Sequence, residues 1–167
     1  MFGRKKPPPP PDSADAQLEA TVRAAMPEAD AETVAIVAAC AGLLAAVAYA
    51  DREFSEAERD HARQVLESVN GIGPTGAAAI LRVLESQVVE LSTVHINRFT
   101  RTLKDLGDRD LRLHVLGSLI ELCAADDALR SPEVVVLRQT ATQLGLEQDD
   151  YNRLQEKHKH KIVMPKH

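Results

Sequence analysis

Residues 34–50 read VAIVAACAGLLAAVAYA, seventeen positions without a charged side chain, and Asp51 follows them directly. A helix built from this segment is apolar on every side, which is the pattern of a helix enclosed by other helices. Seventeen residues also reach the lower limit of length for a membrane-spanning helix. About half of the segment is alanine, which drives membrane insertion weakly, and acidic segments flank it on both sides. We therefore expect a buried core helix and no transmembrane segment.

Outward from this segment, apolar residues recur at helical spacing, and no convincing strand pattern is present. Ser13, Asp30 and Asp108 stand where a side chain can accept a hydrogen bond at a helix N-terminus. The sequence predicts an all-α fold, a single bundle of about seven to eight helices with short connections. The expected helices cover residues 14–26, 30–50, 55–69, 75–91, 92–107, 108–125, 131–144 and 148–158.

Charge and composition divide the chain into three parts. Residues 1–13 carry a net charge of +2 and include Pro7–Pro11, which favours a disordered, extended tether. Such a run serves as a spacer or binds an SH3-like partner protein. Residues 14–156 form the expected helical domain, and residues 157–167 form a basic His/Lys tail. The net charge of residues 14–154 is −10, which argues against nucleic acid as the main partner, because phosphate neutralisation dominates that binding.

The cysteines and the known catalytic motifs narrow the function classes. Cys40 and Cys123 are too few for a disulfide-rich scaffold or a four-cysteine zinc site, and we expect a reducing cytoplasmic setting. His158 and His160 offer two imidazoles in the tail, too few for tight binding of a transition metal. The sequence contains no P-loop, dinucleotide fingerprint, nucleophile elbow or His-Glu-x-x-His motif. We therefore expect a protein without enzymatic activity or an organic cofactor.

A shift of 75 residues superposes two parts of the sequence without a gap. Each part reads as an apolar helix, an Asp at its end, a tight loop and a second helix that opens near a Glu. We interpret this as an internal duplication of a helical hairpin, which predicts a pseudo-two-fold bundle with both Asp-containing loops at the same end. The paired positions include Gly42 with Gly117, Asp51 with Asp126, and Glu58 with Glu133.

Residues 50–58, ADREFSEAE, resemble the pattern of the tellurite-resistance TerB family, which is Ala-Asp-Gly, an apolar residue, Ser or Thr, and then Glu. Residues 125–133, ADDALRSPE, are similar to the second copy of that pattern. The resemblance covers about residues 30 to 156, and the N-terminal domain of the co-chaperone DjlA has the same fold. It implies an all-helical bacterial domain whose clustered loop carboxylates are often interpreted as a divalent-metal site, with a link to tellurite or general stress resistance. Arg52 and Asp127 replace the usual loop glycine, and no J-domain His-Pro-Asp motif is present.

Four carboxylates are the candidate metal ligands: Asp51, Glu58, Asp126 and Glu133. Carboxylate oxygens are hard ligands that suit Ca²⁺, Mg²⁺ or Mn²⁺, and a helix–loop–helix bend can bring residues seven apart to one side. Asp51 and Asp126 follow helix C-termini, where an acidic side chain is electrostatically disfavoured. The alternative is capping, because Ser55-x-x-Glu58 is a capping box and Glu133 can complement a helix dipole. The loops do not match an EF-hand.

A different function class is suggested by residues 71–77, GIGPTGA, which resemble the helix-hairpin-helix DNA-binding loop. Glycines in that loop let backbone amides approach a phosphate. Residues 70–81 contain no Lys or Arg for phosphate contacts. The leading hypothesis is therefore a non-enzymatic, metal-binding scaffold or sensor with an unknown protein partner. The alternative is a DNA-binding protein that uses Gly71–Ala77.

Overall fold

The computed structural model describes residues 13–51, 55–93, 95–125 and 131–157. Within these ranges the chain forms nine α-helices and one short 3-10 helix and contains no strand, which confirms the all-α prediction. The proline tether and the tail from His158 onward lie outside the described residues. The elements are α1 (Ala14–Ala25), α2 (Ala31–Ala48), η1 (Tyr49–Asp51), α3 (Glu56–Glu67), α4 (Pro74–Ser86), α5 (Val88–Thr93), α6 (Ile96–Leu106), α7 (Arg109–Ala124), α8 (Ser131–Gln143) and α9 (Gln148–Glu156).

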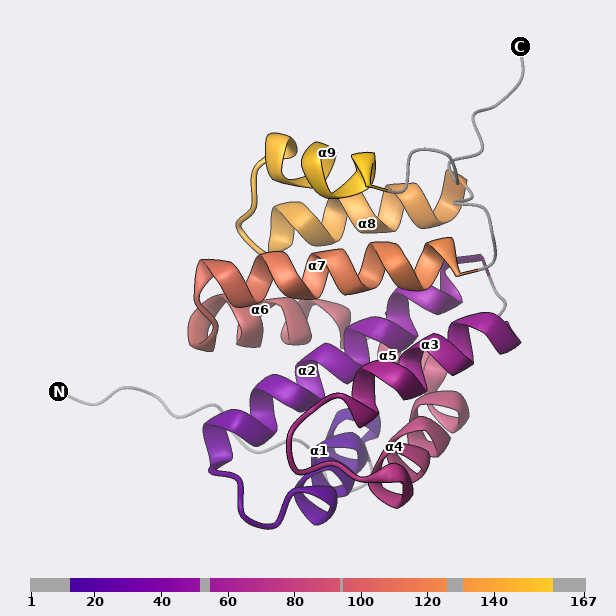
Figure 1. The fold of residues 1–167 in the computed structure, drawn as a ribbon, viewed down its shortest axis with the longest axis vertical. Helices are drawn as coiled ribbons and strands as arrows, with labels where there is room; N and C mark the ends of the chain where they lie inside the picture. Colours follow the sequence, from indigo (N-terminus) through magenta and orange to yellow (C-terminus); the bar gives the residue numbers. More distant parts are fainter. Residues whose placement is uncertain (1–12, 52–54, 94, 126–130, 158–167) are drawn as a thin grey trace, which may run out of the picture.

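The apolar helix α2 is the centre of the bundle. It packs against α1, α5, α6 and α7, and twelve of its eighteen residues are buried. In Figure 1 it runs diagonally between the α1/α4 pair on one side and the layer of α6 to α9 on the other. Within the described residues, α2 is also the one helix with the length and composition to cross a membrane. Its enclosure by other helices accounts for that composition, as the sequence predicts.

Side-chain caps fix the starts of three helices at the expected residues. Asp30 accepts a hydrogen bond from the Thr33 amide at 2.8 Å, and Asp108 accepts one from the Leu111 amide at the same distance. Ser13 caps α1 in the same manner. The hydrogen bonds from Thr33 hold the pKa of Asp30 below its ordinary value. Each cap satisfies one amide that the first helical turn leaves without a partner, so the N-terminus is defined locally.

The region between α4 and α6 differs from the sequence prediction. The helix expected over residues 75–91 is interrupted at Gln87, whose side-chain amide donates to Gln17 on α1 at 3.2 Å. The following helix begins at Ile96 and not at Ser92 or Thr93. Both hydroxyls instead donate back to the Val89 carbonyl, at 3.1 and 2.6 Å. Because these bonds are local alternatives to capping, the two residues close α5 and do not open α6.

The boundaries of the helices follow the 75-residue shift. The shift carries α2 onto α7 within three residues at either end, and it carries α3 onto α8 within one residue. The turn before α4 likewise falls on the turn before α9. The bounds of these two helix pairs therefore agree with the shift, whereas the internal duplication and its pseudo-two-fold symmetry stay predictions.

Candidate metal centre

The first pair of candidate ligands lies around the turn from α2 to α3. Tyr49–Asp51 continue the path of α2 as a 3-10 turn, and Ser55 then caps α3 by accepting a hydrogen bond from the Glu58 amide at 3.0 Å. This bond is one half of the capping box that the sequence predicts. The Glu58 side chain is only 1% exposed, although it belongs to the first turn of a largely polar helix. Capping fixes where Glu58 sits, and packing then removes its carboxylate from water.

The second pair belongs to the turn from α7 to α8. Helix α7 ends at Ala124, and α8 begins at Ser131 with Glu133 in its first turn. Glu133 is also 1% exposed, so the position that the sequence pairs with Glu58 has the same burial. A carboxylate so far removed from water stays ionised only where hydrogen bonds, a cationic side chain or a metal ion stabilise its charge. Asp126 and the side chain of Asp51 lie outside the described part of the chain.

The described ends of both turns lie on one side of the bundle. In Figure 1 the C-terminal ends of α2 and α7 and the N-terminal ends of α3 and α8 all lie at the right-hand side. Contacts of η1 with α8, and of α3 with α7, confirm that these elements are neighbours in space. The two buried glutamates therefore belong to the same end of the molecule, as a shared site requires.

The donor chemistry at this end fits a hard divalent cation. Carboxylates are the oxygen ligands that Ca²⁺, Mg²⁺ and Mn²⁺ take from proteins. Among the side chains that the structure describes, no three His, Cys, Asp or Glu residues are grouped closely enough to hold a metal ion. Two of the four candidate ligands are not among those side chains. Glu58 and Glu133 would supply the buried part of such a site, and Asp51 and Asp126 would complete it.

Comparison with protein-family models identifies the family of this chain. The family model for tellurite resistance protein TerB matches residues 37–156. The chain belongs to the TerB family. Comparisons with curated proteins and with solved structures find no match. The matched segment starts within α2 and ends with α9, so both hairpins and all four candidate carboxylates of this TerB-family chain lie within it.

The glycine-rich loop of this TerB protein has a structural explanation. Gly71 has φ of 95°, a left-handed conformation that glycine adopts easily, and Gly73 and Pro74 begin α4. A Cβ atom on Gly76 would lie 2.9 Å from the Ala25 Cβ, so this glycine allows α4 to pack closely on α1. The turn and the helix packing thus account for Gly71 and Gly76 without a phosphate ligand.

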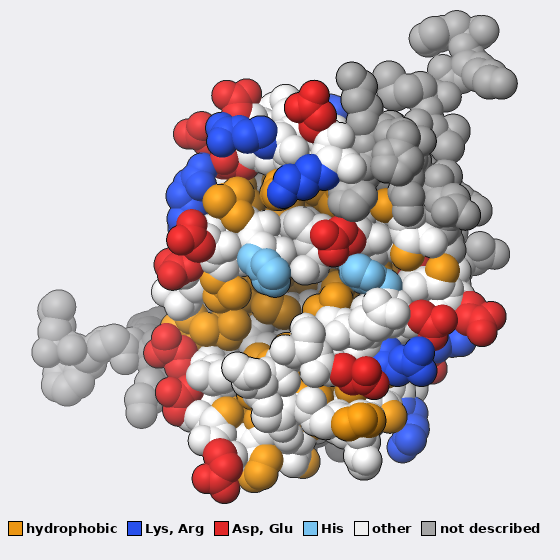
Figure 2. Space-filling view, in the orientation of Figure 1, with side chains coloured by type: hydrophobic (Ala, Val, Ile, Leu, Met, Phe, Trp, Pro, Cys, Tyr) orange, Lys and Arg blue, Asp and Glu red, His pale blue; other side chains and the backbone are white. Residues whose placement is uncertain are grey.

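Sequence reasoning missed an apolar groove on the surface of the TerB fold. A cavity of about 230 Å³ opens between α3 and α7, and α2 forms its floor. We call it the α3/α7 groove. In Figure 2, hydrophobic side chains are visible at the surface in this region of the molecule. Val65 and Val69, which lie at helical spacing from the buried Ala62 and Leu66, are only half-buried and line the groove. The sequence shows the apolar stripe of α3, but the width of that stripe does not show how much of it the neighbouring helices cover.

Cys40 lies in the floor of the α3/α7 groove, on α2. Burial raises the pKa of its thiol to about 12, because the charged thiolate loses its hydration. At neutral pH the thiol is therefore protonated and a poor nucleophile. Cys123 is fully buried in α7. Cys40 thus contributes to the groove as a small apolar side chain.

Proposed function

We propose that this TerB-family chain is a non-enzymatic helical module that binds a divalent cation and acts as a scaffold or sensor in tellurite or stress resistance in the bacterial cytoplasm. The observation that supports this proposal is the burial of Glu58 and Glu133 in equivalent first turns at the same end of the bundle. The proposed ligands are Asp51, Glu58, Asp126 and Glu133.

The physical basis of the proposal is relief of charge repulsion. Four carboxylates brought to one end of an acidic domain repel one another when no cation is present. A divalent ion neutralises that charge and links the turn after α2 to the turn after α7. Because the unfolded chain does not hold these residues together, the ion binds the native state and stabilises it. Occupancy would then stiffen one end of the bundle, which is the change that a partner protein could sense.

Thermal unfolding with and without added metal tests this proposal. A cation at about a hundredfold excess over its dissociation constant stabilises the native state by about 2.7 kcal/mol. For a domain of this size, that stabilisation raises the melting temperature by roughly 6–10 °C. The melts compare Ca²⁺, Mg²⁺, Mn²⁺ and EDTA. We expect the shift with at least one of the three ions and its reversal by EDTA.

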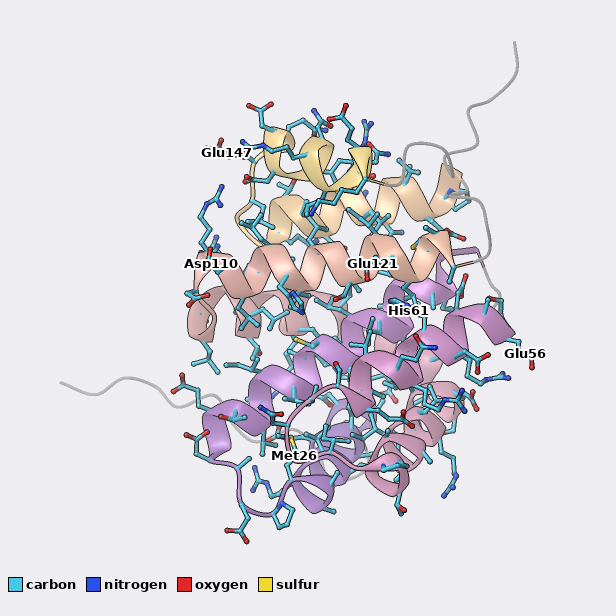
Figure 3. The ribbon with its side chains drawn as sticks, in the orientation of Figure 1. Met26, Glu56, His61, Asp110, Glu121 and Glu147 are labelled. Atoms are coloured by element: carbon cyan, nitrogen blue, oxygen red, sulfur yellow. The ribbon has the colours of Figure 1, made fainter. Side chains whose placement is uncertain are left out.

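Two sets of variants separate metal binding from helix capping. Asp51→Asn with Asp126→Asn should abolish the metal response and leave the metal-free melting temperature unchanged or raised, because repulsion is reduced. Glu56→Gln is the matched control, since Glu56 is exposed in the same turn as Glu58 and its label in Figure 3 lies at the edge of the molecule. If capping is the whole role, no metal shifts the melt, while Glu58→Ala still costs about 0.5–2 kcal/mol.

A further inference from the structure

The α3/α7 groove is an apolar surface for which the described chain provides no cover. Its two walls and its floor come from three helices, and much of its apolar lining is only half-buried. A groove lined by apolar side chains offers a surface on which a further apolar segment can be removed from water. A groove with two helical walls and a helical floor suits a short apolar segment of polypeptide. The half-buried apolar residues that line it are Ile36, Cys40, Val65, Val69 and Leu111.

Carboxylates lie at the margins of this groove. Asp110 precedes the groove residue Leu111 at one end of α7, and Glu121 lies one turn beyond Ser118 at the other end, as the labels in Figure 3 show. Glu32 is exposed one turn before Ile36 on α2, a helix that contains no Lys or Arg. An apolar segment flanked by basic residues is the occupant that fits such a groove, because its cations would face these carboxylates.

A second hollow lies between the groove and the end of α9. Lys157, directly after α9, and Leu154 line this hollow together with His114 and Ser118, and the last two also line the groove. The ridge of α7 between the two hollows is low at Gly117, where an added Cβ would meet only Leu154, at 3.7 Å. Chain that leaves α9 at Lys157 therefore starts beside a path across α7 into the groove.

The tail that follows Lys157 has the composition that the groove requires. Its sequence, HKHKIVMPKH, places Ile162–Met164 between Lys161 and Lys166. Ile162 is five residues beyond Lys157, so an extended chain reaches it over about 17 Å. That length is enough to cross one helix, which is about 10 Å in diameter. The tail is therefore long enough to reach the groove, and its lysines stand on both sides of the apolar segment, as the carboxylates stand at both ends of the groove.

We propose that Ile162–Met164 docks in the α3/α7 groove of its own chain, with Lys161 and Lys166 toward the carboxylates at the margins. The tether gives the tail an effective concentration of the order of millimolar, so a weak contact is sufficient for occupancy. The docked tail would cover the apolar lining and would compete with any other protein for the groove. This interaction is independent of the proposed metal site, which lies at the turns after α2 and α7.

Disulfide trapping in the full chain tests the proposal. In a Cys40→Ser background, Ser118→Cys places a thiol on the groove wall and Met164→Cys places one in the tail, while Cys123 stays buried. The matched control pairs Met164→Cys with Val135→Cys, which is 54% exposed on α8, beside α9 and outside the groove lining. We expect the Ser118→Cys pair to form an intramolecular disulfide about tenfold faster than the control.

Charge substitution in the tail provides the second arm. Ile162→Asp with Val163→Asp should reduce the Ser118→Cys rate to the control rate. Equal rates of disulfide formation for the Ser118→Cys pair and the Val135→Cys pair would overturn the proposal. A Ser118→Cys rate that is unchanged by the Asp substitutions would also overturn it. A disulfide between two chains would also overturn it, because the groove would then hold the tail of a second copy. Without any cysteine substitution, the Ile162→Asp/Val163→Asp variant should shift the amide NMR signals of Val65, Val69 and Leu111, and changes confined to the tail would contradict docking.

Discussion

The two helical hairpins, α2–α3 and α7–α8, are related by the 75-residue shift of the sequence but have different surroundings. Gly42 and Gly117 are paired by the 75-residue shift, yet a Cβ on Gly42 would overlap the Phe99 ring, whereas one on Gly117 would lie 3.7 Å from Leu154. The next pair is Leu43, which is fully buried, and Ser118, which is half-buried at the groove. Equivalent positions thus contribute to the core in one hairpin and to the lining of the α3/α7 groove in the other.

The largest expected effect comes from the pair Leu43 and Ser118. Leu43→Ala should lower the free energy of unfolding by about 2–5 kcal/mol, because it leaves a cavity in the central helix. Ser118→Ala should change it by less than about 0.5 kcal/mol, because a surface hydroxyl is lost without a cavity. Urea denaturation of both variants measures the difference. Similar costs at the two positions would mean that α7 is enclosed as completely as α2.

The paired glycines should give effects of opposite sign. Gly42→Ala forces the new methyl group against Phe99, which is itself buried, and should destabilise the protein by about 1–3 kcal/mol. Gly117→Ala has room for a methyl group and should stabilise the protein by up to about 1 kcal/mol, because alanine is the better helix former. Denaturant midpoints of the two variants give the sign. If both variants were stabilised, α6 would have to yield at Phe99 with little cost.

Local features of the fold were predictable from the sequence, and features that depend on distant contacts were not. Asp30 and Asp108 cap helices through residues three positions away, so the sequence is sufficient to place them. The interruption at Gln87 involves a hydrogen bond to Gln17, seventy positions away, which no local pattern reports. The half-burial of Val65 also depends on a distant contact. The width of the apolar stripe on α3 does not show how much of it α7 covers.

In the candidate metal centre, too, local positions were predictable from the sequence and burial was not. The spacing places Glu58 and Glu133 in first turns, and the structure confirms those positions. Their burial depends on how the two hairpins pack, which the spacing does not specify. Metal binding, and the parts of Asp51 and Asp126 in it, stay predictions. The family match supports the helical framework and does not choose between a cation and capping at these residues.

The smallest effect is expected where α4 and α9 differ, the helices that follow the first and the second hairpin. Helix α4 begins at Gly73 and Pro74 without a side-chain cap, whereas Asp150 in α9 accepts a hydrogen bond from the Glu147 amide at 2.9 Å and pairs with Arg109 at 2.7 Å. The Glu147 amide, together with Arg109, holds the pKa of Asp150 below its ordinary value. A lowered native pKa means that the contribution of Asp150 to stability is complete above the ordinary carboxyl range and is lost as the pH falls through the native pKa.

Amide hydrogen exchange across a pH series measures this difference helix by helix. After correction for the intrinsic exchange rate, acid should reduce protection in α9 more than in α4, because only α9 depends on an ionised cap. Asp150→Asn should lower the melting temperature at pH 7, and the deficit should be smaller at about pH 3, because the wild-type carboxyl loses its charge as the pH falls toward its lowered native pKa. A deficit of the same size at both pH values would show that the shape of the Asp150 side chain, and not its charge, holds α9 against α7.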